Sequence, residues 1–171
     1  KSKALLMGRN GQRVLSVAAR TGRIACVVLD EGELVIWDAS QKAASSTSEA
    51  TKKLRAWVKE FKPDVLVTEN PDAAWKKRGV QIPILKALAS VGEDLSIQNL
   101  VDRRTRRFAN AYVEAEHLGE QFPDLAHLVP KKPAIWKSEP YNLACFEALA
   151  LVREAGLLKP DTSPESEEEI G

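Results

Sequence analysis

Residues 63–71 read PDVLVTENP, and this stretch decides the fold. After the helix-breaking Pro63, the residues from Val65 to Thr68 are apolar or β-branched, and Glu69 closes the run before an Asn-Pro pair. A run of this kind, bounded by turn residues on both sides, is typical of a strand buried in the middle of a parallel sheet. We therefore predict a central strand with a carboxylate at its carboxyl end.

The residues before this strand predict three antiparallel strands. Apolar and β-branched residues run over 13–18, 24–29 and 33–37, and Gly-containing turn signals separate them at 20–22 and 30–32. Strands joined by such short turns pair as hairpins, because the chain can only reverse its direction there. The chain is therefore predicted to open with a meander of three strands.

Helices are predicted to alternate with the remaining strands. Ser46 and Glu49 have the spacing of a capping box, and apolar residues from Ala50 to Phe61 then recur at helical spacing. The order βββαβαβα plus a C-terminal helix predicts an α/β fold, with a mixed five-stranded sheet and helices on both faces. The later elements are a helix over 81–91, a strand over 96–101, a helix over 110–120, a Pro- and Lys-rich loop over 122–136, and a helix over 140–155 that Gly156 caps.

Length and charge predict one domain with polar ends. We place the domain of this 171-residue chain at 12–158, between a basic N-terminal lead over 1–11 and an acidic, disordered tail over 159–171. The net charge of +1 gives no global argument for a nucleic-acid partner. Cys26 and Cys145 lie in apolar segments and predict two buried thiols in a reducing compartment. With no membrane-spanning apolar stretch and no signal-peptide pattern, we expect a cytoplasmic protein.

Two carboxylates are the candidates for chemistry. Glu69 closes a strand at the edge where open α/β sheets bind ligands, unless it is a solvated strand end. Glu147 lies in a helix that is apolar almost all round, so it should face a cleft or have a cationic partner. Acids from a strand end and a distant helix can hold two Mg²⁺ ions, which stabilise the attacking and leaving oxygens of a phosphodiester.

Three segments together resemble the acid-bearing segments of the RuvC-type Holliday junction resolvases, which belong to the RNase H-like superfamily. They are Val14 to Arg20 followed by a Gly turn, Val65 to Glu69, and Phe146 to Leu151. A group of bacterial resolvase-like proteins is also similar in its last segments, which here read FPDL over 122–125, KKP over 131–133 and WKSE over 136–139.

The resemblance spans roughly residues 13–155 and carries several implications. It implies an RNase H-like fold, a homodimer, and Mg²⁺ or alternatively Mn²⁺ at Glu69 and Glu147. It also implies catalytic roles for Glu69, Glu147 and Glu139. The substrate that it implies is branched or structured nucleic acid, DNA in preference to RNA.

The resemblance breaks at the first strand, where the family has an Asp that bridges both metals and this chain has Ala18. The family's last helix carries Asp residues one turn apart, yet Ala144 stands three residues before Glu147. Glu139 lies eight residues before Glu147, which is roughly 12 Å along a helix axis. We therefore expect metal-dependent hydrolysis to be impaired or absent. Ala18 is either a natural loss that leaves a binding protein or an introduced substitution that inactivates a nuclease.

Basic residues supply candidate contacts to nucleic acid. Arginines in a loop or at a helix start bind phosphates through charge and bidentate hydrogen bonds, unless they are simply solvated. An aromatic residue among cations can stack on an unpaired base, unless it packs on a neighbouring helix. The candidates are Arg103, Arg104, Arg106 and Arg107 after the last strand, Trp75, Lys76, Lys77 and Arg78 after Glu69, and Lys131 and Lys132 in the Pro-rich loop.

Three functions are compatible with these residues. The first is a RuvC-like nuclease fold that binds branched DNA, with hydrolysis weakened at Ala18. The second is a homodimeric nucleic-acid-binding protein without catalysis. The third is an actin-like ATPase lobe, which shares the opening strand order but needs a Gly-rich phosphate hairpin and an Asp on the first strand.

Overall fold

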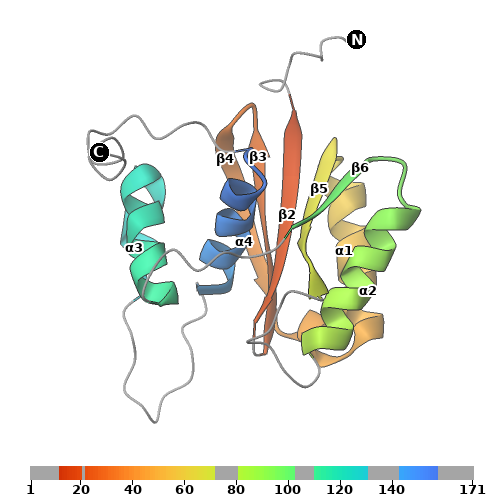
Figure 1. The fold of residues 1–171 in the computed structure, drawn as a ribbon. Coiled ribbons are helices and arrows are strands. Elements are labelled where there is room, and N and C mark those ends of the chain that lie inside the picture. The colour runs from red at the N-terminus through yellow and green to blue at the C-terminus, as the bar shows by residue number, and fades with distance from the viewer. Residues whose placement is uncertain (1–11, 21, 72–80, 103–109, 131–142, 158–171) are drawn as a thin grey trace.

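The computed structural model describes residues 12–20, 22–71, 81–102, 110–130 and 143–157, and Figure 1 draws the remainder as a thin grey trace. The described residues form one sheet in the order β4-β3-β2-β5-β6, which confirms the predicted mixed five-stranded sheet. The strands are β2 (Arg13–Arg20), β3 (Arg23–Asp30), β4 (Glu33–Ser40), β5 (Val65–Glu69) and β6 (Gln98–Asp102). The helices are α1 (Thr47–Phe61), α2 (Gln81–Asp94), α3 (Ala111–Gln121) and α4 (Leu143–Glu154), with the short 3-10 helices η2 (Lys42–Ser45) and η4 (Pro123–Leu128).

The first three strands form the predicted antiparallel meander. The hairpin between β3 and β4 closes through Glu31 and Gly32, whose φ angles of 55° and 84° are both positive. A two-residue turn of type I′ requires this conformation, which Gly adopts without steric cost. The first strand is longer than predicted. Arg20, expected in a turn, still lies in β2 because it pairs across the hairpin with Arg23.

The other half of the sheet is parallel. β2 pairs with β5, with Ser16 level with Val67, and β5 pairs with β6, with Glu69 level with Asp102. α2 continues to Asp94, beyond the predicted end at residue 91. A Cβ at Gly92 would lie 2.5 Å from the Asn99 side chain, so this glycine permits close packing against β6 rather than ending the helix.

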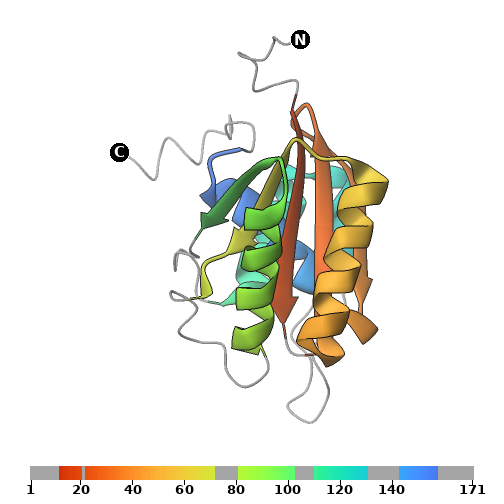
Figure 2. The ribbon, with the colours of Figure 1, turned by 90° about the vertical axis from the view of Figure 1, so that its right-hand side faces the viewer.

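Helices cover both faces of the sheet, as Figures 1 and 2 show. Because side chains alternate along a strand, β2 supplies both cores. Leu15, Val17 and Ala19 pack in the cluster that includes α1 and α2. Val14 and Ala18 pack in the cluster that includes α3 and α4.

Local signals set the start and end of the first helix. The Ser46 hydroxyl oxygen accepts a hydrogen bond from the backbone N–H of Glu49 at 3.1 Å, as the capping box predicted. Leu54, Trp57 and Phe61 are buried at helical spacing. The helix ends at Phe61, two residues before the proline that cannot continue it.

The last helix lies between the sheet and α3, and residues 143–152 are all buried. Arg153 of α4 donates to the Glu114 carboxylate of α3, and both side chains are largely buried. Gly156, with φ of 76°, follows the helix as the predicted C-cap. Pro123–Leu128 form the 3-10 helix η4 inside the segment that was expected to be a loop.

Candidate functional site at the carboxyl edge of the sheet

Glu69 ends β5 as a buried carboxylate. It is 3% exposed, so the alternative of a solvated strand end is wrong. Because side chains alternate between the two faces of a strand, Glu69 lies on the same face as Val65 and Val67 and on the opposite face from Thr68. Val65 and Val67 pack in the cluster that includes α4. Glu69 therefore lies on the α4 face, at the carboxyl edge of the parallel strands.

Ala18 lies on the same face of the neighbouring strand. Ser16 is level with Val67 in the pairing of β2 with β5, and two further residues along that register bring Ala18 level with Glu69. Ala18 is 0% exposed and packs among the apolar residues beneath α4. The position at which the sequence resemblance predicts an acid is therefore a closed apolar contact.

A buried hydrogen bond fixes α4 over this face of β2. The Ser16 hydroxyl donates to the backbone carbonyl oxygen of Ala148 at 2.7 Å. Ala144 and Cys145 pack against Ala25, which pairs with Ala18 across the first hairpin. The first half of α4 therefore lies over the carboxyl end of β2.

Glu147 reaches this edge from α4 and forms an ion pair. The residue is 6% exposed, and its Oε1 lies 3.2 Å from Nη1 of Arg20. Arg20 occupies the same face of β2 as Ser16 and Ala18, and its side chain is 24% exposed. Of the two alternatives left open for Glu147, a cleft or a cationic partner, the structure shows the cationic partner. The structure thus brings Glu69, Ala18, Glu147 and Arg20 to one end of the sheet.

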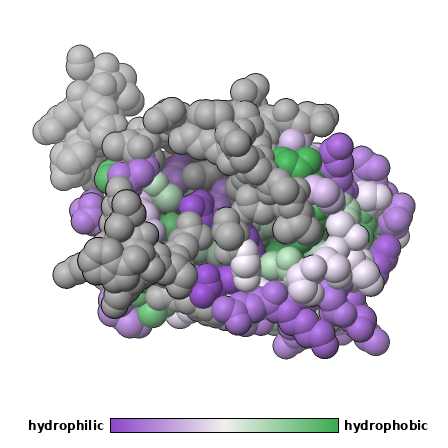
Figure 3. All heavy atoms as spheres, turned by 90° about the horizontal axis from the view of Figure 1, so that it is seen from below, coloured by the Kyte–Doolittle hydropathy of each residue, from purple (hydrophilic) through white to green (hydrophobic). Residues whose placement is uncertain are grey.

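Figure 3 looks onto this end of the molecule. Hydrophilic residues, drawn in purple, gather along the right-hand rim, the side on which Figure 1 places α1 and α2. The described part of this end is therefore polar at its rim, while Glu69 and Glu147 are buried.

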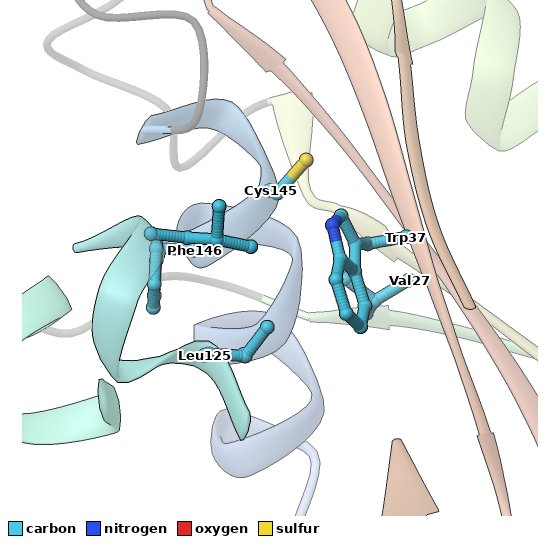
Figure 4. A pocket seen from close by; sticks show the side chains of 6 residues that line it. Val27, Trp37, Leu125, Cys145 and Phe146 are labelled. Atoms are coloured by element: carbon cyan, nitrogen blue, oxygen red, sulfur yellow. The ribbon is translucent and has the colours of Figure 1, made fainter. Parts of the chain in front are cut away.

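A separate apolar pocket lies between α4, η4 and the outer strands (Figure 4). Its lining residues are Val27, Trp37, Leu125, Leu128, Cys145 and Phe146. Burial and then the nearby charge of Asp38 raise the pKa of the Cys145 thiol to about 12, so the thiol is protonated at neutral pH. Cys26 and Cys145 are buried and free, as predicted, and neither is an activated nucleophile.

Solved structures resemble this architecture although the sequence matches no protein-family model and no curated protein. The structure of T. thermophilus RuvC in complex with a Holliday junction substrate aligns with a TM-score of 0.52 at 11% identity, over 85% of this chain and 93% of that one. The crystal structure of Ydc2, the yeast mitochondrial Holliday junction resolvase, aligns with a TM-score of 0.52 at 11% identity, over 86% of this chain and 80% of that one. The chain has a RuvC-like, RNase H-like fold.

The sequence resemblance predicts a metal site, and the described residues do not complete one. Where they are described, no three His, Cys, Asp or Glu side chains are grouped so as to hold a metal ion. Two Mg²⁺ ions need several carboxylate oxygens, but Ala18 offers a methyl group and Glu147 already contacts a guanidinium. Glu139, the third predicted acid, lies outside the described residues.

The predicted basic contacts also lie outside the described residues, so they stay predictions for the RuvC-like fold. They are Trp75, Lys76, Lys77, Arg78, Arg103, Arg104, Arg106, Arg107, Lys131 and Lys132. Within the described residues, no helix is long and apolar enough to cross a membrane.

Two residues at this edge of the sheet, Arg20 and Asp102, were not among the predicted site residues. Arg20 was placed in a turn, although its spacing of two from Ala18 would put both on one face of a longer strand. Asp102 ends β6 level with Glu69. The pairing of β5 with β6 could have located it, because parallel strands bring their carboxyl ends to one edge.

Proposed function

We propose that this protein binds branched or structured nucleic acid, DNA in preference to RNA, and that metal-dependent phosphodiester hydrolysis is impaired or absent. The observation that carries the proposal is Ala18, fully buried on the strand of a RuvC-like fold where the family places a metal-bridging acid. The partner class is supported by the similar T. thermophilus protein, whose structure contains a Holliday junction substrate.

Loss of hydrolysis follows from the chemistry of the site. Two-metal catalysis stabilises the attacking and leaving oxygens only when carboxylates hold both ions in place. A methyl group at Ala18 cannot ligate a cation, and Glu147 is turned toward Arg20. This favours a nucleic-acid-binding protein over an active Mg²⁺-dependent or Mn²⁺-dependent nuclease. The two solved structures named above, both Holliday junction resolvases, do not support an actin-like ATPase lobe.

We propose that binding rests on the basic residues predicted from the sequence. In the sequence, the arginines at 103, 104, 106 and 107 follow β6, and the cations at 76–78 follow β5. Contacts of this kind bind phosphates with little sequence discrimination and weaken as salt rises. We also propose a homodimer, which would suit the symmetry of a four-way junction, and a cytoplasmic location.

A binding titration tests the proposal. Labelled four-way DNA junction, a matched RNA junction, duplex DNA and single-stranded DNA are titrated in Mg²⁺ and in EDTA, each at two salt concentrations. We expect the DNA junction to bind most tightly, with affinity that falls at higher salt and is the same in EDTA. We also expect no cut products after long incubation with Mg²⁺ or Mn²⁺. Failure to bind any nucleic acid would contradict the proposal, and so would cleavage of the junction.

A further inference from the structure

We propose that Arg20 supplies permanently the positive charge that a divalent ion would supply at this edge, so that Glu147 is closed to metal ions. The inference concerns the protein alone and does not rest on nucleic-acid binding. Ala18 and a paired Glu147 stand where the sequence resemblance implies carboxylate ligands for metal ions.

A buried carboxylate needs a compensating positive charge. Glu147 lies in a helix whose residues 143–152 are all buried, and its side chain is only 5% exposed. An uncompensated charge there would strongly destabilise the fold. Arg20 contributes this compensation at 3.2 Å, from a strand that is fixed within the sheet.

A guanidinium differs from a metal ion because it can neither dissociate nor lose its proton in the physiological pH range. The compensation of Glu147 is therefore independent of the Mg²⁺ concentration. A divalent cation that approached the same carboxylate would be repelled by the guanidinium, which contacts Oε1 directly.

The neighbouring contacts hold Glu147 in this arrangement. Ala148, the next residue of α4, accepts the hydrogen bond from Ser16 of the same strand at 2.7 Å. Two successive residues of α4 are thus bound to one face of β2, by Ser16 and by Arg20. Ala18, which lies between Ser16 and Arg20 on this face of β2, carries no polar group.

Thermal unfolding in EDTA, Mg²⁺ and Mn²⁺ tests the inference. Wild type should melt at the same temperature in all three, since its carboxylate is already compensated. Arg20→Met removes the charge and keeps an apolar chain of similar length. This variant should melt lower in EDTA and regain stability with Mn²⁺, because a cation then has access to Glu147. The double variant Arg20→Met/Glu147→Gln should melt above Arg20→Met in EDTA and show no response to Mn²⁺.

The control removes an exposed ion pair of the same chemistry. Arg55 lies 3.8 Å from Asp94, and both side chains are more than half exposed. Arg55→Met should behave like wild type, because exposed pairs contribute little to stability. An Arg20→Met variant that shows no more response to Mn²⁺ than Arg55→Met would overturn the inference.

A direct Mn²⁺ titration of folded wild type decides the matter even if Arg20→Met does not fold. Mn²⁺ binding, followed by electron paramagnetic resonance, should be equal for wild type and Glu147→Gln. A clear loss of Mn²⁺ affinity in Glu147→Gln would show that Glu147 ligates metal in the native protein and would overturn the inference. That result would leave the junction-binding titration, and with it the proposed partner, unaffected.

Discussion

Buried Ala18 and the ion pair of Glu147 with Arg20 lie together at the carboxyl edge of the sheet, where the sequence resemblance predicts metal ligands. Glu69 and Glu147 could be found from sequence, because each is a charge inside an apolar segment. Arg20 could not be found in this way, because the sequence does not show whether a polar residue just before a Gly turn ends the strand or begins the turn. The ion pair between Arg20 and Glu147 joins residues 127 apart, and no local pattern contains that information.

Restoring an acid at position 18 should not restore cleavage. Ala18→Asp buries a carboxylate level with Glu69, so we expect a loss of stability on the order of 3 kcal/mol. We expect no junction cleavage with Mg²⁺ or Mn²⁺, since Glu147 stays paired with Arg20. Urea unfolding and a cleavage assay with a labelled junction measure the two effects.

The matched control at position 18 is Ala18→Ser, which adds a polar atom without a charge. It should cost about 1–2 kcal/mol and leave junction binding unchanged. Metal-dependent cutting by a folded Ala18→Asp variant would contradict the prediction. It would identify the chain as a nuclease that is inactive only because the acid at position 18 is missing.

At the scale of elements, the sequence predicts the ends of helices and strands best where proline or other turn-forming residues flank them. β5 begins and ends as predicted, because Pro63 precedes it and an Asn-Pro pair follows it. α2 continues past its predicted end, because Gly92 does not end the helix but lets it pack closely against the Asn99 side chain. The position of α4 on the sheet depends on tertiary contacts alone, since Ser16 and Ala148 are separated by 132 residues.

Ser16→Ala tests how α4 is attached to the sheet. The substitution leaves the buried carbonyl of Ala148 without its 2.7 Å donor, so we expect a loss of about 1–2 kcal/mol in the free energy of unfolding. Ser45→Ala is the control, because its hydroxyl donates at 2.6 Å to the carbonyl of Lys42 at an exposed site. The control should change stability by less than about 0.5 kcal/mol. Equal losses for the two variants in urea unfolding would contradict a specific role of Ser16.

For the whole molecule, the order of strands and helices was sufficient to predict the layers but not which residues fill each of them. The sequence predicted helices on both faces, and the two clusters on either side of the sheet confirm it. It also predicted two buried thiols. Cys26 packs in the cluster with α1 and α2, whereas Cys145 lies on α4 on the opposite face, so each thiol reports on a different layer.

These thiols make stability depend on alkaline pH. Burial, followed by the charge of Asp38, raises the pKa of Cys145 from 9.0 to about 12 and raises the pKa of Cys26 still further. In the unfolded chain the thiols ionise near their ordinary pKa, while in the folded protein they stay protonated. Their contribution is therefore fully present below pH 9 and is lost as the pH rises toward 12, at about 1.4 kcal/mol per pH unit for each thiol.

Urea unfolding one pH unit below and one unit above 9.0 measures this loss. Because other groups also titrate in this pH range, wild type is compared with the double variant Cys26→Ala/Cys145→Ala. The quantity compared is the change in the free energy of unfolding between the two pH values. The double variant should lose less stability than wild type over this interval, by up to about 2–3 kcal/mol, because it lacks both thiols. Single variants should each recover part of the difference. If the double variant loses as much stability as wild type, the thiols already ionise in the folded protein, and the two layers are more open to water than their packing implies.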